Sequence, residues 1–138
     1  MTGNTEVRVP ISSDADVVTA RAEGRSLASQ IPFSATDLTL IATAISEVAR
    51  NIVLYARRGE VVLRLIHEED REGILVLAQD RGPGIEDVAL ALQDHYSTGQ
   101  GSGLGLPGAR RLMDEFDLQS RPGSGTTVTM RKWAPRRA

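Results

Sequence analysis

The residues with the clearest chemical potential in this sequence form a glycine-rich stretch that runs from Gly99 to Gly108. Glycine tolerates positive φ and lets a ligand approach the main chain closely. An amphipathic helix from about Leu106 to Phe116 is predicted to follow, and a helix start presents unpaired N–H groups and a positive dipole end, which suit a phosphate. A flexible connector has a similar composition. The apolar helix, however, would anchor the far end of the stretch and leave its near end free to close over a ligand.

The stretch matches neither of two common phosphate-binding motifs. Gly-x-Gly-x-x-Gly occurs from Gly103 to Gly108, but a dinucleotide-binding fold needs that pattern directly after a strand. Here a loop containing Tyr96, Ser97 and Thr98 precedes it. A P-loop is also absent, because no glycine run is followed by Gly-Lys and then Ser or Thr.

A polar pair, Glu47 and Asn51, is predicted to lie on the second of two long helices. Four residues at 100° each place the two side chains roughly 40° apart and one turn displaced, away from the core stripe. A carboxylate there could take a proton from a hydroxyl or water, and an amide oxygen could ligate Mg²⁺. Taken alone, the pair is more typical of an ordinary exposed helix face. Its sector also holds Leu40, Ala44 and Leu54, whereas the solvated flank is expected to carry Thr43, Arg50 and Arg57.

A third feature, Asp80-Arg81-Gly82-Pro83-Gly84, follows a predicted strand. A carboxylate at a strand end can accept a hydrogen bond from an exocyclic amino group such as that of adenine. The glycines would let the base lie close against the main chain, although such a sequence is also a good loop without any ligand. The three features in this order make a nucleotide site the leading hypothesis.

Hydrophobic periodicity predicts the elements that position these residues. A strand at Glu6–Ile11 precedes a helix that Ser13 can cap and that runs to about Gln30. Its apolar face comprises Val17, Ala20, Leu27 and Ile31, and Val18 suits either an exposed docking face or the core. A second helix, opened by Ser34 or Thr36 and broken by Gly59, carries the stripe Leu38, Ile41, Ile45, Val48 and Ile52.

The rest of the chain is predicted to be richer in strands. Val61–Ile66 and Ile74–Gln79 are strands joined by a polar turn, a short helix is expected near Glu86–Leu92, and Leu118–Arg121 and Thr126–Lys132 form a closing hairpin. Strands and helices do not alternate. The order therefore predicts an α+β two-layer sandwich, with helices on one face of a mixed, mostly antiparallel sheet.

Composition limits the classes of function. The chain of 138 residues is expected to form a single domain over residues 1–138. It has no cysteine, which excludes disulfides and thiolate sites, and its two histidines are too few for a convincing metal cluster. A net charge of −2 argues against nucleic-acid binding, and the basic stretch from Arg131 to Arg137 is expected to be solvated. Without a run of about 18 apolar residues, no membrane segment is expected, and a cytoplasmic protein is predicted.

Together these motifs resemble those of the GHKL superfamily of ATPases and kinases, which includes DNA gyrase, heat-shock chaperone ATPases, sensor histidine kinases and anti-sigma-factor serine kinases. Glu47-x-x-x-Asn51 resembles the N box of that superfamily, and Asp80-x-Gly82-x-Gly84-Ile85 resembles its first glycine box. Gly101-x-Gly103-Leu104-Gly105-Leu106 resembles the second glycine box, and Gly125-Thr126 the pair that completes the adenine pocket.

The resemblance implies the GHKL (Bergerat, histidine-kinase-like ATPase) fold with a mobile ATP lid, and a site for ATP and Mg²⁺. It also implies roles: Glu47 as catalytic base, Asn51 as Mg²⁺ ligand and Asp80 as acceptor for the adenine amino group. The other residues implied to bind the nucleotide are Gly82, Gly84, Ile85, Gly99, Gly101, Ser102, Gly103, Leu104, Gly105, Leu106 and Thr126.

Within the superfamily, the small size and the segments Glu47–Tyr55 and Leu106–Phe116 are similar to the switch serine/threonine kinases of the bacterial stressosome. That group implies phosphorylation of STAS-domain partners and, after release from them, binding and activation of a serine phosphatase. Two alternatives stay open. One is an anti-sigma factor with serine kinase activity, and the other is a nucleotide-gated binding module without catalysis.

Overall fold

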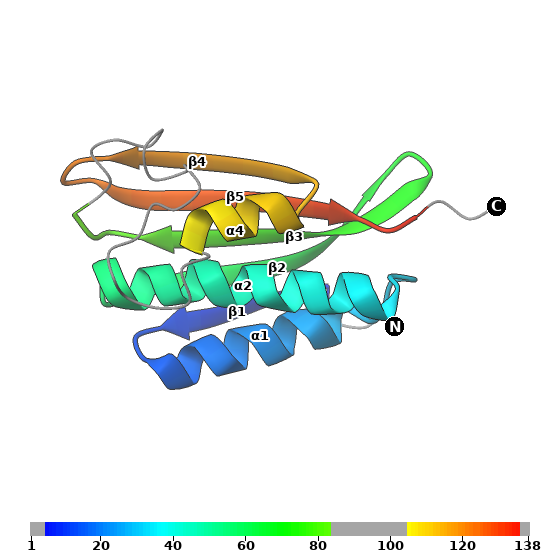
Figure 1. The fold of residues 1–138 in the computed structure, drawn as a ribbon, viewed down its shortest axis with the longest axis horizontal. Coiled ribbons are helices and arrows are strands. Elements are labelled where there is room, and N and C mark those ends of the chain that lie inside the picture. Colours follow the sequence, from blue (N-terminus) through cyan, green and yellow to red (C-terminus); the bar gives the residue numbers. More distant parts are fainter. Residues whose placement is uncertain (1–4, 84–104, 136–138) are drawn as a thin grey trace.

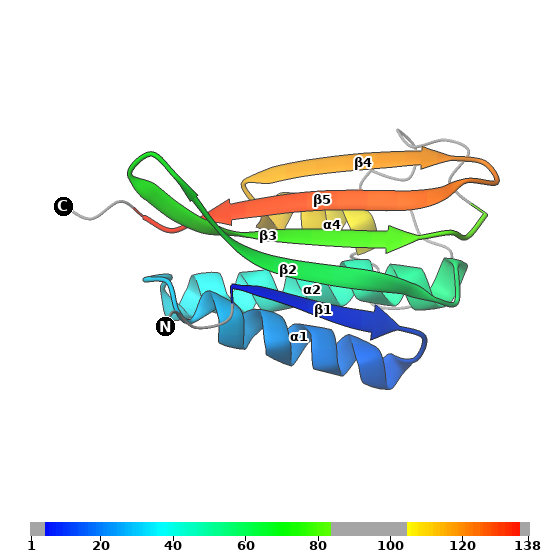
Figure 2. The ribbon, with the colours of Figure 1, turned by 180° about the vertical axis from the view of Figure 1, so that it is seen from behind.

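Five strands form one sheet in the order β1-β2-β3-β5-β4 (Figures 1 and 2). The computed structural model describes residues 5–83 and 105–135, and within them all four strand pairs are antiparallel. The predicted antiparallel character is confirmed, and the described part of the sheet has no parallel pair. The strands are β1 (Glu6–Ile11), β2 (Gly59–Glu68), β3 (Arg71–Asp80), β4 (Glu115–Arg121) and β5 (Gly125–Trp133).

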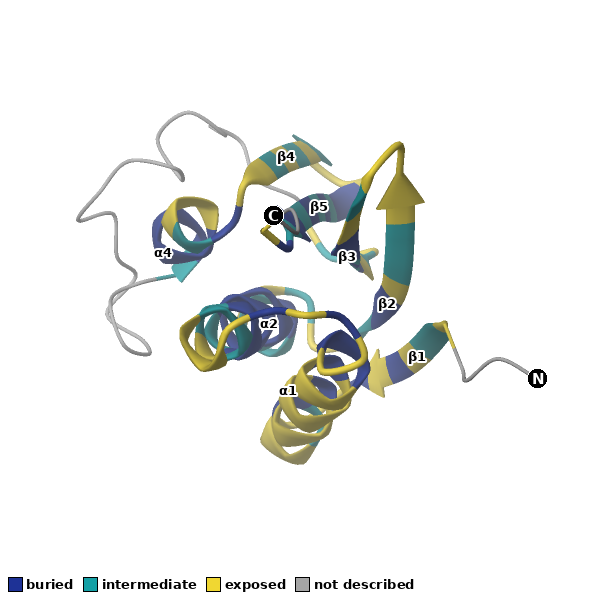
Figure 3. Cartoon of the chain, turned by 90° about the vertical axis from the view of Figure 1, so that its right-hand side faces the viewer, coloured by how far each residue is buried: buried dark blue, intermediate teal, exposed yellow. Residues whose placement is uncertain are grey.

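The described helices cover one face of this sheet, as predicted (Figure 3). They are α1 (Asp14–Ala28), α2 (Ala35–Tyr55) and α4 (Gly105–Leu112). The predicted helix near Glu86–Leu92 and the predicted lid lie outside the described residues.

The two long helices begin with different capping arrangements. Ser34 caps α2, since its side chain accepts a hydrogen bond of 3.0 Å from the amide of Asp37. Ser13 occupies the N-cap position of α1, but its side chain makes no capping bond there. The Asp16 carboxylate instead accepts a bond of 2.8 Å from the amide of Ser12. That main-chain bond, helped by the Ser12 and Ser13 hydroxyls, lowers the pKa of Asp16.

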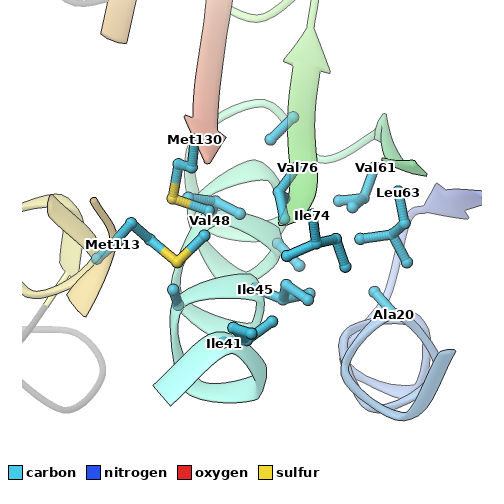
Figure 4. Packing of buried hydrophobic residues seen from close by; sticks show 14 of the residues in the cluster. Ala20, Ile41, Ile45, Val48, Val61, Leu63, Ile74, Val76, Met113 and Met130 are labelled. Carbon is cyan, nitrogen blue, oxygen red and sulfur yellow. The ribbon is translucent and has the colours of Figure 1, made fainter. Parts of the chain in front are cut away.

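The apolar stripe of α2 forms the centre of the core. Ile41, Ile45 and Val48 face the inner side chains of β2, β3 and β5 (Figure 4), and all three are at most 1% exposed. By length and composition α2 could cross a membrane, and 50% of that apolar stretch is buried in the fold. The contact of its stripe with the sheet accounts for the hydropathy of the helix.

Several predicted boundaries and environments are wrong in instructive ways. Helix α2 ends at Tyr55, four residues before Gly59, and Arg57 there adopts a φ of 71°. Helix α4 ends at Leu112, and Phe116 belongs to β4, because alternation with Leu118 suits the inner face of a strand. For Val18 the sequence left an exposed face and the core open, and the side chain is 67% exposed, which excludes the core.

The basic stretch near the C-terminus is not simply solvated, because Arg131 and Lys132 belong to β5. Lys132 is only 9% exposed, and its Nζ donates a bond of 2.9 Å to the carbonyl of Leu112 at the last residue of α4. This cation therefore stabilises the carboxyl end of α4, where the helix dipole is negative.

Gly24 allows α1 to lie close to α2, because it has no side chain at their contact. A Cβ at this position would lie 2.2 Å from Ile45 Cδ1 and 3.6 Å from Leu63 Cδ2, both in the buried core. We expect Gly24→Val to lower the free energy of unfolding by about 2 kcal/mol, because the added methyl groups overpack this crossing. Urea denaturation measures the effect. Ala22→Val, at an exposed position of the same helix, is the control, and equal destabilisation by the two variants would contradict the prediction.

Candidate functional site

Asp80 ends the central part of the sheet, where it pairs with Gly59 of β2 on one side and with Thr126 of β5 on the other. Its Oδ1 accepts hydrogen bonds from the main-chain amides of Gly82, at 2.8 Å, and Thr126, at 3.2 Å. Within the described residues, Oδ2 accepts no bond. The main chain therefore fixes the carboxylate and leaves one oxygen for a donor on a ligand.

The β4–β5 hairpin brings Gly125 against the main chain of Asp80. Gly125 has a φ of 84°, and a Cβ there would lie 2.2 Å from the carbonyl oxygen of Asp80. The hydroxyls of Thr126 and Ser120 lie 2.9 Å apart, and Ser120 also donates to the carbonyl of Gly125. The sequence analysis did not identify Ser120 as a residue of this site. Its spacing could have shown it, because Ser120 alternates with Leu118 and Phe116 on the inner face of β4.

We expect Gly125→Ala to lower the free energy of unfolding by about 3 kcal/mol, because it combines left-handed strain with a collision against the main chain. Gly123→Ala provides the matched control, since Gly123 also has a positive φ, of 78°, but a Cβ there would meet nothing within 4 Å. Gly123→Ala introduces the backbone strain without the collision, so we expect it to lower the free energy of unfolding by about 1 kcal/mol. Urea denaturation measures both variants, and equal losses would show that the contact with Asp80 contributes nothing.

Glu47 lies on the side of α2 that faces α4. It is 7% exposed, and its Oε1 accepts a bond of 3.0 Å from the amide of Gly105, the first residue of α4. Its Oε2 accepts a bond of 2.9 Å from Nη1 of Arg50. Arg50 was expected on a solvated flank, and this expectation is wrong, because its side chain turns back along the helix to the carboxylate. A buried carboxylate requires such compensation of its charge.

Asn51 lies on α2 between Glu47 and the carboxyl end of the helix. It is half-buried, one turn beyond Glu47 and about 7.5 Å before Ala56 along the helix axis. Ala56 in turn contacts the loop after β3, since a Cβ on Gly82 would lie 2.6 Å from Ala56 Cβ. The carboxyl end of α2, the end of β3 and the β4–β5 turn thus lie at one end of the molecule, on the left of Figure 1, and the start of α4 lies further in, beside α2.

The structure describes only part of the predicted nucleotide-binding set. It brings Asp80 together with Gly82 and Thr126, and Glu47 together with Gly105. Asn51 lies one turn beyond Glu47 on α2. The side chain of Leu106 is 5% exposed and packs in the core, so only its main chain is available to a ligand. Outside the described residues lie Gly84, Ile85, Gly99, Gly101, Ser102, Gly103 and Leu104, whose roles stay predictions.

The donor set also bears on the predicted Mg²⁺. Residues 5–83 and 105–135 contain no group of three or more His, Cys, Asp or Glu side chains that could hold a metal ion. A Mg²⁺ at the amide oxygen of Asn51 would therefore need water and ligand phosphates as its other ligands, which is how Mg²⁺ is commonly bound. The site thus fits a metal that arrives with a nucleotide.

Known proteins match the chain over most of its length. The sequence profile of the family described as "Histidine kinase-like ATPase domain" matches residues 11–132. The chain is 43% identical over 130 residues to "Serine/threonine-protein kinase RsbT" of Bacillus subtilis (strain 168), an alignment that covers 94% of this chain and 98% of the relative. It is 32% identical over 123 residues to "Anti-sigma F factor" of Caldanaerobacter subterraneus subsp. tengcongensis, with 85% of each chain covered.

The fold has a counterpart among solved structures. "Mycobacterial sensor histidine kinase MprB" superimposes with a TM-score of 0.58 and 18% sequence identity, over 95% of this chain and 100% of that one. At this identity the likeness concerns the fold.

Proposed function

This chain belongs to the family of histidine kinase-like ATPase domains, and from that membership we propose that it is an ATP-dependent serine/threonine protein kinase. The observation that carries the proposal is the position of Glu47, a buried carboxylate on the same helix as Asn51 and close to the start of α4. The similarity to a protein named as a serine/threonine kinase, over nearly the whole chain, supports the same reaction.

Five of the described site residues have a defined task in this proposal. The free oxygen of Asp80 accepts a hydrogen bond from the adenine amino group, and Gly82 and Thr126 hold the carboxylate in position. Glu47 accepts the proton of the serine or threonine hydroxyl of the substrate protein. Asn51, one turn beyond Glu47 on α2, would ligate Mg²⁺. Phosphoryl transfer depends mostly on such positioning and on charge stabilisation.

ATP supplies the phosphoryl group in this reaction, and Mg²⁺ neutralises charge on the phosphates. We further propose that the substrates are STAS-domain proteins, that the kinase works in a stressosome partner switch, and that the released kinase binds and activates a serine phosphatase. We also propose that the chain is a single domain and that it acts in the cytoplasm. Both named relatives support a regulatory role that depends on protein partners.

The direct test is transfer of label from [γ-³²P]ATP to a purified STAS-domain protein of the same organism. We expect label on serine or threonine of the STAS-domain protein, dependent on both Mg²⁺ and this chain. Stable complex formation without any transfer of label would contradict the kinase proposal and favour a nucleotide-gated binding module.

An anti-sigma factor with kinase activity is the second candidate, and the 32% identity to an anti-sigma F factor favours keeping it. The two candidates differ in the protein that they retain. Affinity capture with the purified chain, with and without ATP, should retain a serine phosphatase if the first proposal is right. Capture of a sigma factor would support the second.

A further inference from the structure

We propose that Arg50 is a positioning residue for Glu47 and that it acts together with the main-chain N–H of Gly105. The inference rests on the kinase function proposed above, because it assigns Arg50 a role relative to the base of that reaction. The two donors reach Glu47 from different elements. Arg50 lies three residues further along α2 and bonds Oε2 at 2.9 Å, whereas Gly105 begins α4 and bonds Oε1 at 3.0 Å.

Glu47 needs these two donors because its side chain is long and its carboxylate is buried. Only 7% of the Glu47 side chain is exposed, whereas 35% of the Arg50 side chain is. Removal of a carboxylate from water is costly unless charge and hydrogen bonds compensate it. The guanidinium supplies a full positive charge, and the first amide of α4 adds the positive end of a helix dipole.

The two donors also restrict the direction of the carboxylate. A free glutamate side chain samples many rotamers, and a misplacement of the reacting group by about 1 Å can cost about 100-fold in rate. Because Arg50 bonds one oxygen and Gly105 the other, two separate parts of the chain act on the plane of the Glu47 carboxylate.

Helix geometry separates this role from nucleotide binding. Relative to Glu47, Asn51 is rotated by roughly +40° around α2 and Arg50 by roughly −60°. The two side chains therefore lie on opposite sides of Glu47. Arg50 can hold the carboxylate without occupying the side on which Asn51 would ligate Mg²⁺.

The test compares Arg50→Met, which keeps length but removes charge, with Arg50→Lys, which keeps the charge. We expect Arg50→Met to lower kcat for phosphorylation of the STAS-domain protein by about tenfold and to leave the Kd for ATP within about twofold. Arg50→Lys should recover most of the lost kcat. Arg21→Met, at an exposed arginine of α1, is the matched control and should behave like the wild type.

A second readout does not depend on catalysis. In the ¹⁵N-labelled full chain without nucleotide, Arg50→Met should move the amide proton resonance of Gly105 upfield, because the carboxylate that accepts its bond is no longer held. Arg50→Lys should leave that resonance near the wild-type position. If the wild type transfers no phosphate, the kinase proposal fails, while the Gly105 resonance still decides whether Arg50 holds Glu47.

Four results would overturn the inference. They are an unchanged Gly105 resonance in Arg50→Met, a kcat within about twofold of the wild type, equal kcat values in the Met and Lys variants, and an ATP Kd raised more than about fivefold. The last result would make Arg50 a nucleotide ligand.

Discussion

Asp80→Asn is expected to weaken ATP binding about 100-fold while leaving the fold in place. The two main-chain donors, Gly82 and Thr126, both bond Oδ1, and an asparagine oxygen can accept from both in the same way. The new NH₂ group would then occupy the position of Oδ2. There it would face the adenine amino group, so that a charge-assisted hydrogen bond is replaced by two opposed donors.

The size of this effect follows from the energy of the contact. A hydrogen bond to a charged group contributes roughly 1.5–3 kcal/mol, and the upper part of that range corresponds to about 100-fold in Kd. Isothermal titration calorimetry with ATP measures the change. Asp114→Asn is the matched control, because the Asp114 carboxylate also accepts a main-chain bond, from Trp133 at 2.8 Å, but lies at the other end of β5.

An Asp80→Asn variant that binds ATP as tightly as Asp114→Asn does would place the adenine elsewhere. The midpoint of urea unfolding provides the necessary check on folding. A large fall in stability of Asp80→Asn would show that Oδ1 and Oδ2 both support the hairpin, and the affinity would then have to be measured on the folded fraction.

The fold was predictable because its signals are local and strongly periodic. The stripe of α2 repeats at helical spacing, and the buried residues Ile74, Val76 and Ala78 alternate along β3, so their burial follows from the period. In β2 the consecutive residues Val61, Val62 and Leu63 are all buried, which alternation does not predict. The ends of elements were less predictable because tertiary contacts decide them. Phe116 fits the end of a helix by sequence, but pairing of β4 with β5 places it in a strand.

The candidate site has a sequence signal only as an ordered set. Asp80 before its glycines and Glu47 one turn before Asn51 are each ordinary when taken alone, and their order along the chain is the signal. Arg50 carried none, because an arginine three residues after a glutamate is usually a surface pair of little energetic value. Its significance comes from the burial of Glu47 against α4, and that burial depends on a residue 58 positions away.

Glu47→Gln should abolish phosphoryl transfer while ATP remains bound. The substitution keeps the shape of the side chain, and the amide oxygen can still accept the bond from Gly105. It removes the negative charge that pairs with Arg50 and the basicity that a hydroxyl proton requires. A positioned general base contributes about 10²–10⁴-fold to a rate, so we expect kcat to fall about 1,000-fold with the Kd for ATP within about twofold.

The matched control for this variant is Glu60→Gln. Glu60 is also paired with an arginine, since its Oε1 lies 2.7 Å from Nη1 of Arg8, but both side chains lie in an exposed contact between β1 and β2. Label transfer from [γ-³²P]ATP should be normal in this control and lost in Glu47→Gln. Equal transfer by the two variants would remove Glu47 from the reaction.

The same variant separates the kinase proposal from a binding module. Activation of the serine phosphatase, in the proposed switch, depends on binding and needs no proton transfer. Glu47→Gln should therefore still activate the phosphatase while it no longer phosphorylates the STAS-domain protein. If Glu47→Gln loses both activities together although ATP binding and stability are normal, then the carboxylate, through its bond to Gly105, controls the position of α4 for both partners. In that case Glu47 would act through the conformation of α4, and the assignment of a catalytic base would be wrong.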